Sequence, residues 1–192
     1  MGTTIAILFI NEQSAYTFHV GDSRVYQFRD GQLIYKTKDH SKVSEMVENS
    51  ILSEEEARVH HESNVLTQAL GIQSAINISE SGDMPYEKFD TFLICTDGVW
   101  GAMSFDQLQN CIGDYDELVS NSSANISKVI SNQMIDTSSK RQDNFTSLII
   151  KLMNNSNMKS NVTILDRIKR NQIPLLLFGL LGLMQIWNMT SL

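Results

Sequence analysis

The chain has 192 residues, enough for one domain with a sizeable core, and its 42% hydrophobic and 19% charged residues are typical of a globular protein. The net charge of −7 is uneven, because residues 1–139 carry 20 acidic against 8 basic side chains and residues 140–192 carry 2 against 7. An acidic body has no basic stripe to neutralise phosphates, so the composition argues against nucleic acid as a partner. Cys95 and Cys111 form neither a CxxC motif nor a disulfide framework, which suits a reducing compartment.

The first forty residues predict an antiparallel β-meander. Their apolar and β-branched runs are separated by short polar turns, the usual pattern of strands. Asp30-Gly31 is a strong hairpin signal. The predicted strands span residues 4–10, 15–20, 24–29 and 33–37.

After residue 40 the apolar positions change to helical spacing. Ser53 and Glu56 form the pattern of a capping box, which places a helix start at this point. Helices are predicted at residues 41–51, 53–59, 64–70, 104–111 and 123–135, and strands at 76–84, 92–95 and 147–153.

Three aspartates lie in turns or loops beside predicted strands. Asp97 ends the buried strand 92–95, Asp22 lies between two strands, and Asp143 directly precedes the last strand. Carboxylates are the ligands that hard divalent cations prefer, and loops at one edge of a sheet can bring such side chains together. Each aspartate also fits an ordinary turn position, and spacing alone leaves both interpretations open.

Residues 154–172 have the composition of a linker, polar at first and then basic, and residues 173–189 are predicted to form a C-terminal transmembrane helix. The apolar run from Ile173 to Trp187 follows three basic residues, as in the positive-inside pattern, and Trp187 is placed as an interface anchor. Fifteen helical residues span about 22 Å, less than the roughly 30 Å hydrocarbon core. The alternative is a buried or partner-docking helix. The expected location is the cytoplasmic face of a membrane, with the cytoplasm as alternative.

Seven motifs, in order over about residues 1–153, resemble those of the bacterial metal-dependent protein phosphatases (the PPM, or protein phosphatase 2C, family). They are Gly-Thr-Thr (residues 2–4), His-Val-Gly-Asp-Ser-Arg-Val-Tyr (19–26), Thr-Lys-Asp-His-Ser (37–41), Glu-Glu-Glu-Ala (54–57), Asn-Val-Leu-Thr-Gln-Ala-Leu-Gly (64–71), Thr-Asp-Gly (96–98) and Asp-Asn-Phe-Thr (143–146). One such motif is weak evidence, whereas the ordered set is specific.

The resemblance implies an α+β fold, a β-sandwich flanked by helices in four αββα layers, with a metal centre in a cleft at one end. It implies hydrolysis of phosphoserine and phosphothreonine on proteins with Mn²⁺ or Mg²⁺, two and in some members three ions. In the family a metal-activated water attacks phosphorus while the ions neutralise the phosphoryl oxygens. The expected partners are phosphorylated substrates of a cognate Ser/Thr kinase.

By the same resemblance, Asp97 and Asp143 match ligands of the binuclear site, and Asp22 matches the aspartate that shares a third metal with Asp97. The neighbouring residues are expected to shape the turns around these ligands. They are Gly21, Ser23, Arg24, Gly98 and Asn144. Residues 41–63 correspond to the family's mobile flap over the active site.

The sequence departs from the family upstream of its Gly-Thr-Thr strand. The family has there a phosphate-binding arginine and an Asp-Gly-x-Gly-Gly motif whose aspartate bridges the metals, and neither precedes residue 2 here. The chain is therefore identified as a family member that lacks the N-terminal part of the domain, a fragment or a degenerate form. Apolar faces of the sandwich are expected to be left uncovered. The alternative function is a catalytically impaired binding module.

A serine hydrolase using Ser23 with His40 is the third hypothesis. It is disfavoured because the sequence has no Gly-x-Ser-x-Gly elbow and Ser23 shares a tight turn with Asp22. His19 and His40 are interpreted as structural histidines. His60 and His61 could contact a metal, but adjacent residues on a helix do not share a face.

Overall fold

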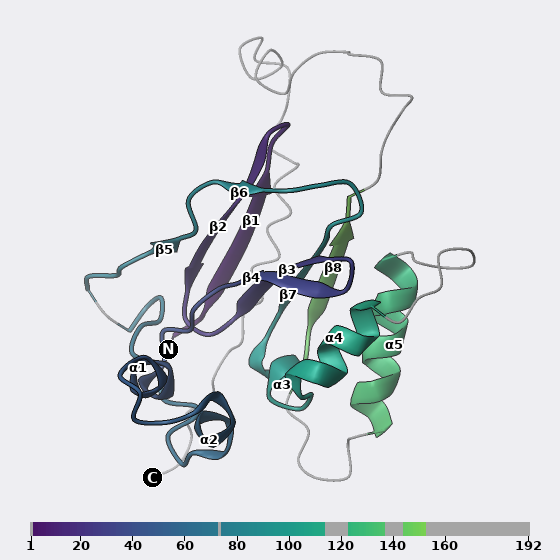
Figure 1. The fold of residues 1–192 in the computed structure, drawn as a ribbon. Helices are drawn as coiled ribbons and strands as arrows, with labels where there is room; N and C mark the ends of the chain where they lie inside the picture. Colours follow the sequence, from purple (N-terminus) through teal and green to yellow (C-terminus); the bar gives the residue numbers. More distant parts are fainter. Residues whose placement is uncertain (1, 73, 114–122, 137–143, 153–192) are drawn as a thin grey trace.

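The structure is a computed structural model and describes residues 2–72, 74–113, 123–136 and 144–152. Two β-sheets pack face to face, and helices lie against the outer face of the second (Figure 1). The strands are β1 (Ile5–Ile10), β2 (Ser14–Val20), β3 (Arg24–Arg29), β4 (Gln32–Lys36), β5 (Ser79–Glu80), β6 (Met84–Pro85), β7 (Thr91–Cys95) and β8 (Ser147–Lys151). The helices are α1 (Lys42–Glu48), α2 (Glu54–Val59), α3 (Asp97–Trp100), α4 (Phe105–Gly113) and α5 (Ser123–Asp136).

The first sheet has the order β1-β2-β5, with β6 also paired to β2, and the second has the order β4-β3-β7-β8. All the pairs are antiparallel. The β3–β4 hairpin turns at Asp30 and Gly31, which both have positive φ, as a two-residue primed turn requires. The four predicted strands and this hairpin are therefore confirmed. The single meander is wrong, because β2 and β3 do not pair and the chain passes from the first sheet to the second between them.

The second sheet is buried on both faces because it lies between the first sheet and the helices. On one face Phe92 of β7 packs with Ala15 of β2 and Met84 of β6. On the other face Tyr26, Phe28 and other residues of the sheet pack against α4 and α5. The members of this larger cluster include Leu93, Cys95, Leu108, Ile112, Ile126, Ile130 and Met134.

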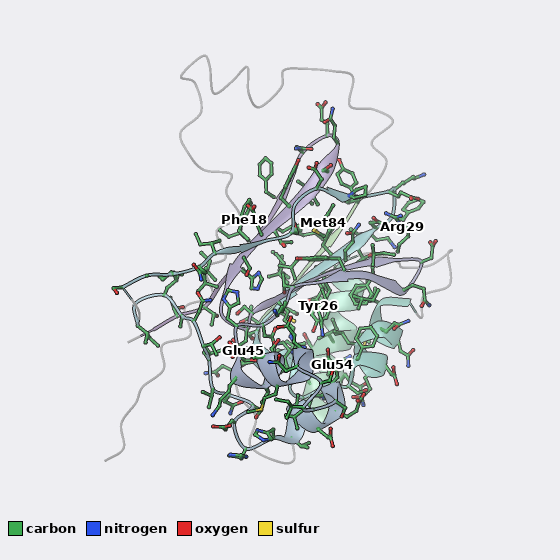
Figure 2. The ribbon with its side chains drawn as sticks, turned by 60° about the vertical axis from the view of Figure 1, so that its left-hand side comes forward. Phe18, Tyr26, Arg29, Glu45, Glu54 and Met84 are labelled. Atoms are coloured by element: carbon green, nitrogen blue, oxygen red, sulfur yellow. The ribbon has the colours of Figure 1, made fainter. Side chains whose placement is uncertain are left out.

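The outer face of the first sheet is apolar and partly exposed. Ile7 and Phe9 of β1 are 39% and 48% exposed, and they pair across the sheet with Phe18 and Tyr16 of β2. Figure 2 shows Phe18 on this sheet, away from the helices that carry Glu45 and Glu54. Among the described residues, helices therefore supply one outer layer of the predicted four, against the second sheet.

Two predicted elements are wrong. Residues 64–70 do not form a helix, because their backbone groups bond to other segments: Thr67 N–H donates to His40 O at 2.8 Å, and Leu70 pairs with Thr3. The strand predicted at 76–84 is reduced to β5 and β6, since a turn with Gly82 at positive φ separates them. The short helix α3 was not predicted.

The predicted and observed helix boundaries agree better where the helix has a capping residue. Ser53 accepts from Glu56 N–H and Glu56 accepts from Ser53 N–H, so the capping box at the start of α2 is confirmed. None of the helices in the described ranges is both long and apolar enough to cross a membrane. The predicted linker 154–172 and the predicted helix 173–189 lie outside these ranges.

Candidate metal centre

Asp22 lies in the tight turn that joins β2 to β3. The turn begins at Gly21, whose φ of +104° favours glycine, and a Cβ at this position would lie 2.3 Å from Thr4 Cγ2. Thr4 Oγ1 also hydrogen bonds to Ser23 Oγ at 2.8 Å. The start of the chain before β1 therefore packs directly against the turn and fixes the backbone on both sides of Asp22.

Asp97 begins α3, immediately after β7. Its Oδ1 accepts a hydrogen bond from Gly98 N–H at 2.9 Å. Gly98 has no positive φ, contrary to the expected sharp turn. It is required for another reason, because a Cβ there would lie 2.4 Å from the carbonyl oxygen of Asn144. The backbone at Asn144 thus packs onto the Asp97–Gly98 segment, while the predicted ligand Asp143 lies outside the described residues.

The two described aspartates are brought together by α3. Trp100, one helical turn after Asp97, donates its Nε1–H to the carbonyl oxygen of Asp22 at 3.0 Å. Asp22 is 8% exposed. Burial, followed by the negative charges of Asp97 and Asp39, raises the pKa of Asp22 to about 7. A bound cation would offset both causes, because it favours the ionised form of a buried carboxyl and neutralises the charge of Asp97.

Arg24 follows the Asp22 turn but makes its strongest contacts elsewhere. Its Nη2 and Nε donate to the carboxylate of Asp39 at 2.7 Å and 2.9 Å, and its guanidinium lies 3.7 Å from the ring centroid of Trp100. Its Nη1 donates to Tyr26 Oη at 3.0 Å. Arg24 therefore connects the turn, α3 and the segment before α1.

A cavity of about 240 Å³ lies next to this cluster. Arg24, Trp100 and Asp39 form one wall, and residues of α1 and α2 such as Val47 and Arg58 form another. Two ion pairs connect the helical pair to the second sheet and the segment after it. They are Lys36–Glu54 and Lys38–Glu48.

The two histidines that the sequence assigns to structure lie against the Asp22 turn. His40 Nδ1 accepts from Gly21 N–H at 3.3 Å, and its Nε2 bonds to Ser79 Oγ at 2.8 Å. The ring of His19 is 4.8 Å from that of His40 and bonds through Nε2 to the carbonyl of Lys38. Because both ring nitrogens of His40 are engaged in these bonds, the Ser23–His40 hydrolase hypothesis is not supported.

His60, His61 and Glu62 are also brought together. Their potential ligand atoms lie within 4.8 Å of one another, because α2 ends at Val59 and His60 has an extended backbone. The expectation that helical geometry separates the two histidines is therefore wrong. His60 Nδ1 accepts from Glu62 N–H at 3.2 Å, and Glu62 pairs with Lys42, so local contacts already account for this arrangement.

Comparison with known proteins finds relatives among the protein phosphatases. A protein phosphatase 2C-type protein of Streptococcus pyogenes is 35% identical over 113 residues, which are 59% of this chain and 46% of that protein. Over this stretch the chain is similar to the protein phosphatase 2C-type proteins. No family model matches it. The chain spans about half the length of the curated relatives it matches.

Solved structures of PPM phosphatases share the fold. The serine/threonine phosphatase of S. agalactiae superposes with a TM-score of 0.66 at 26% identity, over 80% of this chain and 60% of that chain. The catalytic domain of the phosphatase PstP, solved with two manganese ions, has a TM-score of 0.60 at 22% identity, over 79% of this chain and 60% of that chain. The predicted α+β sandwich of the PPM type is therefore confirmed.

The contacts of Trp100 and His40 were not predicted as parts of the site. Trp100 lies 78 residues from Asp22 in the sequence, and its role depends on α3, a helix that the sequence pattern did not predict. Its position three residues after Asp97 was the available signal, since residues at this spacing lie on one face of a helix.

Proposed function

We propose that this chain carries part of the metal centre of a protein serine/threonine phosphatase. In this proposal Asp22 and Asp97 hold divalent cations, together with Asp143. The observation that supports it is the buried position of Asp22 beside Asp97, which raises its pKa to about 7 and which a cation would compensate. Carboxylates from separate loops are the donor set that Mn²⁺ and Mg²⁺ prefer.

The ions would supply charge for the phosphoryl oxygens and activation of water, as in metal-dependent phosphoryl transfer. The chain's own residues would hold them in place. Trp100 fixes the backbone of Asp22, and Gly98 lets the segment at Asn144 approach Asp97. The cavity between Trp100 and the α1–α2 pair would receive the polypeptide that flanks the phosphorylated residue. The proposed substrates are phosphoproteins made by a cognate Ser/Thr kinase.

We expect the full 192-residue chain to hydrolyse an aryl phosphate such as p-nitrophenyl phosphate when Mn²⁺ is added. Asp97→Asn removes a metal ligand and should lower the rate about 100-fold or more, comparable to the loss of other transition-state charge stabilisers. Initial rates with a Mn²⁺ titration measure this. Asp106→Asn is the matched control, since Asp106 is an exposed acid of α4 and should leave the rate unchanged.

Equal rates for the wild type and Asp97→Asn would refute the assignment of Asp97 as a ligand. Binding of Mn²⁺ and of a phosphopeptide without hydrolysis would favour the alternative, a binding module built on the same site.

We also propose that residues 173–189 anchor the protein to the cytoplasmic face of a membrane. Support comes from the apolar run, its upstream basic residues and Trp187. The full-length chain should pellet with membranes and resist carbonate extraction, and deletion of residues 166–192 should release it. Recovery of the full-length chain in the soluble fraction would contradict the anchor and favour the cytoplasmic alternative.

A further inference from the structure

His40 holds both backbone polar groups of the residue that precedes Asp22. The N–H of His40 donates to the carbonyl oxygen of Gly21 at 2.9 Å, and the N–H of Gly21 donates to His40 Nδ1 at 3.3 Å. The orientation of the Gly21 backbone determines the position of the Asp22 backbone that follows it. His40, distant in sequence, therefore holds the backbone directly before Asp22 in place.

The imidazole is fixed in one orientation by its surroundings. Because Nδ1 accepts from Gly21, the proton of the neutral ring is on Nε2, which donates to Ser79 Oγ at 2.8 Å. His40 is buried, and its carbonyl oxygen accepts from Thr67 N–H at 2.8 Å. The ring of His19 packs beside it. His40 is thus held from its ring and from its backbone, as an accurate positioning group must be.

The remaining contacts of the turn lie on the other side of Asp22. Trp100 binds the carbonyl oxygen of Asp22, and Thr4 binds the side chain of Ser23. Gly21 has no side chain to restrict its backbone, and glycine can adopt many conformations besides the observed φ of +104°. Loss of the His40 bonds would release the Gly21 side of the turn while leaving the Trp100 and Thr4 contacts in place.

We propose that His40 is a positioning residue for the metal centre, acting through the Gly21 backbone to direct the Asp22 carboxylate toward a cation shared with Asp97. His40 does not contact the metal in this proposal. The inference rests on the proposed function, because it requires that Asp22 be a ligand.

Two substitutions separate positioning from simple filling of space. Asparagine carries its Oδ1 on Cγ, as histidine carries Nδ1, so His40→Asn can still accept from Gly21 N–H. Leucine has a similar shape but no acceptor, so His40→Leu leaves a buried N–H without that partner. The bond from His40 N–H to Gly21 O is a backbone contact and is available to both variants.

The test is a Mn²⁺ titration of the full chain at pH 8, followed by the loss of the electron paramagnetic resonance signal of free Mn²⁺. We expect His40→Leu to bind Mn²⁺ about tenfold more weakly and His40→Asn to stay within about threefold of the wild type. Amide hydrogen exchange at Gly21 should accelerate in the leucine variant only. Gln13→Leu, at an exposed residue of the turn between β1 and β2, is the control and should change neither quantity.

If His40→Leu does not fold, Ser79→Ala supplies the second measurement, since it removes the bond that fixes the ring, and it should weaken Mn²⁺ binding about fivefold, outside the threefold range that counts as unchanged. Unchanged affinity in that variant would then count against positioning. Wild-type affinity in a folded His40→Leu variant, or equal weakening by leucine and asparagine, would overturn the inference and leave the proposed function intact. A wild-type chain that does not bind Mn²⁺ would overturn both.

Discussion

Replacing Asp90 by alanine should lower the free energy of unfolding by about 3 kcal/mol, because it removes the centre of a buried polar network. The side chain of Asp90 is fully buried between the β6–β7 loop and the end of β3. Arg29 donates to Oδ1 from Nε and to Oδ2 from Nη2, both at 2.9 Å. Oδ2 also accepts from Gln27 Nε2 at 2.8 Å and from Glu87 N–H at 2.9 Å. Urea unfolding, with an unchanged m-value, measures the loss.

The matched control is Glu87→Ala, which removes the other carboxylate that pairs with Arg29. This pair is short, at 2.6 Å, but the Glu87 side chain is 68% exposed, so its loss should cost less than about 1 kcal/mol. Burial acts to raise the pKa of Asp90, but the hydrogen bonds from Arg29, Glu87 N–H and Gln27 hold it below the ordinary value. The contribution of Asp90 should therefore be complete above about pH 4 and decline at lower pH. Equal losses from the two variants would contradict the network.

The strands of the first forty residues could be predicted because their causes are local. Alternating apolar residues and the Asp30-Gly31 turn specify β1 to β4 without any distant contact. The failure at residues 64–70 has the opposite cause. Their helical spacing is overridden by backbone bonds to Thr3 and His40, which come from segments that the local pattern does not contain.

The same division applies to the candidate site. The motifs around Asp22 and Asp97 are continuous in sequence and could be recognised from it, but what holds the two together is not. Trp100 reaches Asp22 because β3 and β7 pair in the second sheet, with Arg24 opposite Cys95, and His40 reaches Gly21 because the chain returns after β4. Gly98 shows the same limit of sequence-based prediction. The sequence assigns it to a turn, whereas the structure requires glycine there because the backbone of Asn144 approaches closely.

Asp22→Asn should stabilise the metal-free chain at pH 8, although it removes a proposed metal ligand. The pKa of Asp22 is raised to about 7 from 3.8, so the buried carboxyl is protonated more readily in the folded state than in the unfolded state. Its contribution to stability is complete below about pH 4 and is lost as the pH rises through 7. This difference in pKa corresponds to about 4 kcal/mol. We expect the free energy of unfolding of the variant at pH 8 to exceed that of the wild type by about 2 kcal/mol, or about 5 °C in Tm. The gain is smaller than the full difference because the new amide must also be accommodated.

Thermal unfolding at several pH values measures the effect, as the difference in Tm between the variant and the wild type. It should grow between about pH 4 and pH 7 and then level off, and Asp30→Asn at the exposed hairpin turn should show no such trend. Addition of Mn²⁺ should raise the Tm of the wild type more than that of the variant, because the variant has lost one proposed ligand, and at saturating Mn²⁺ the order of the two proteins should reverse. This reversal is expected because the Asp22 carboxylate destabilises the folded chain without metal and stabilises it when the ion is bound. A variant less stable than the wild type at pH 8 without metal would show that the Asp22 carboxylate is compensated by the protein itself.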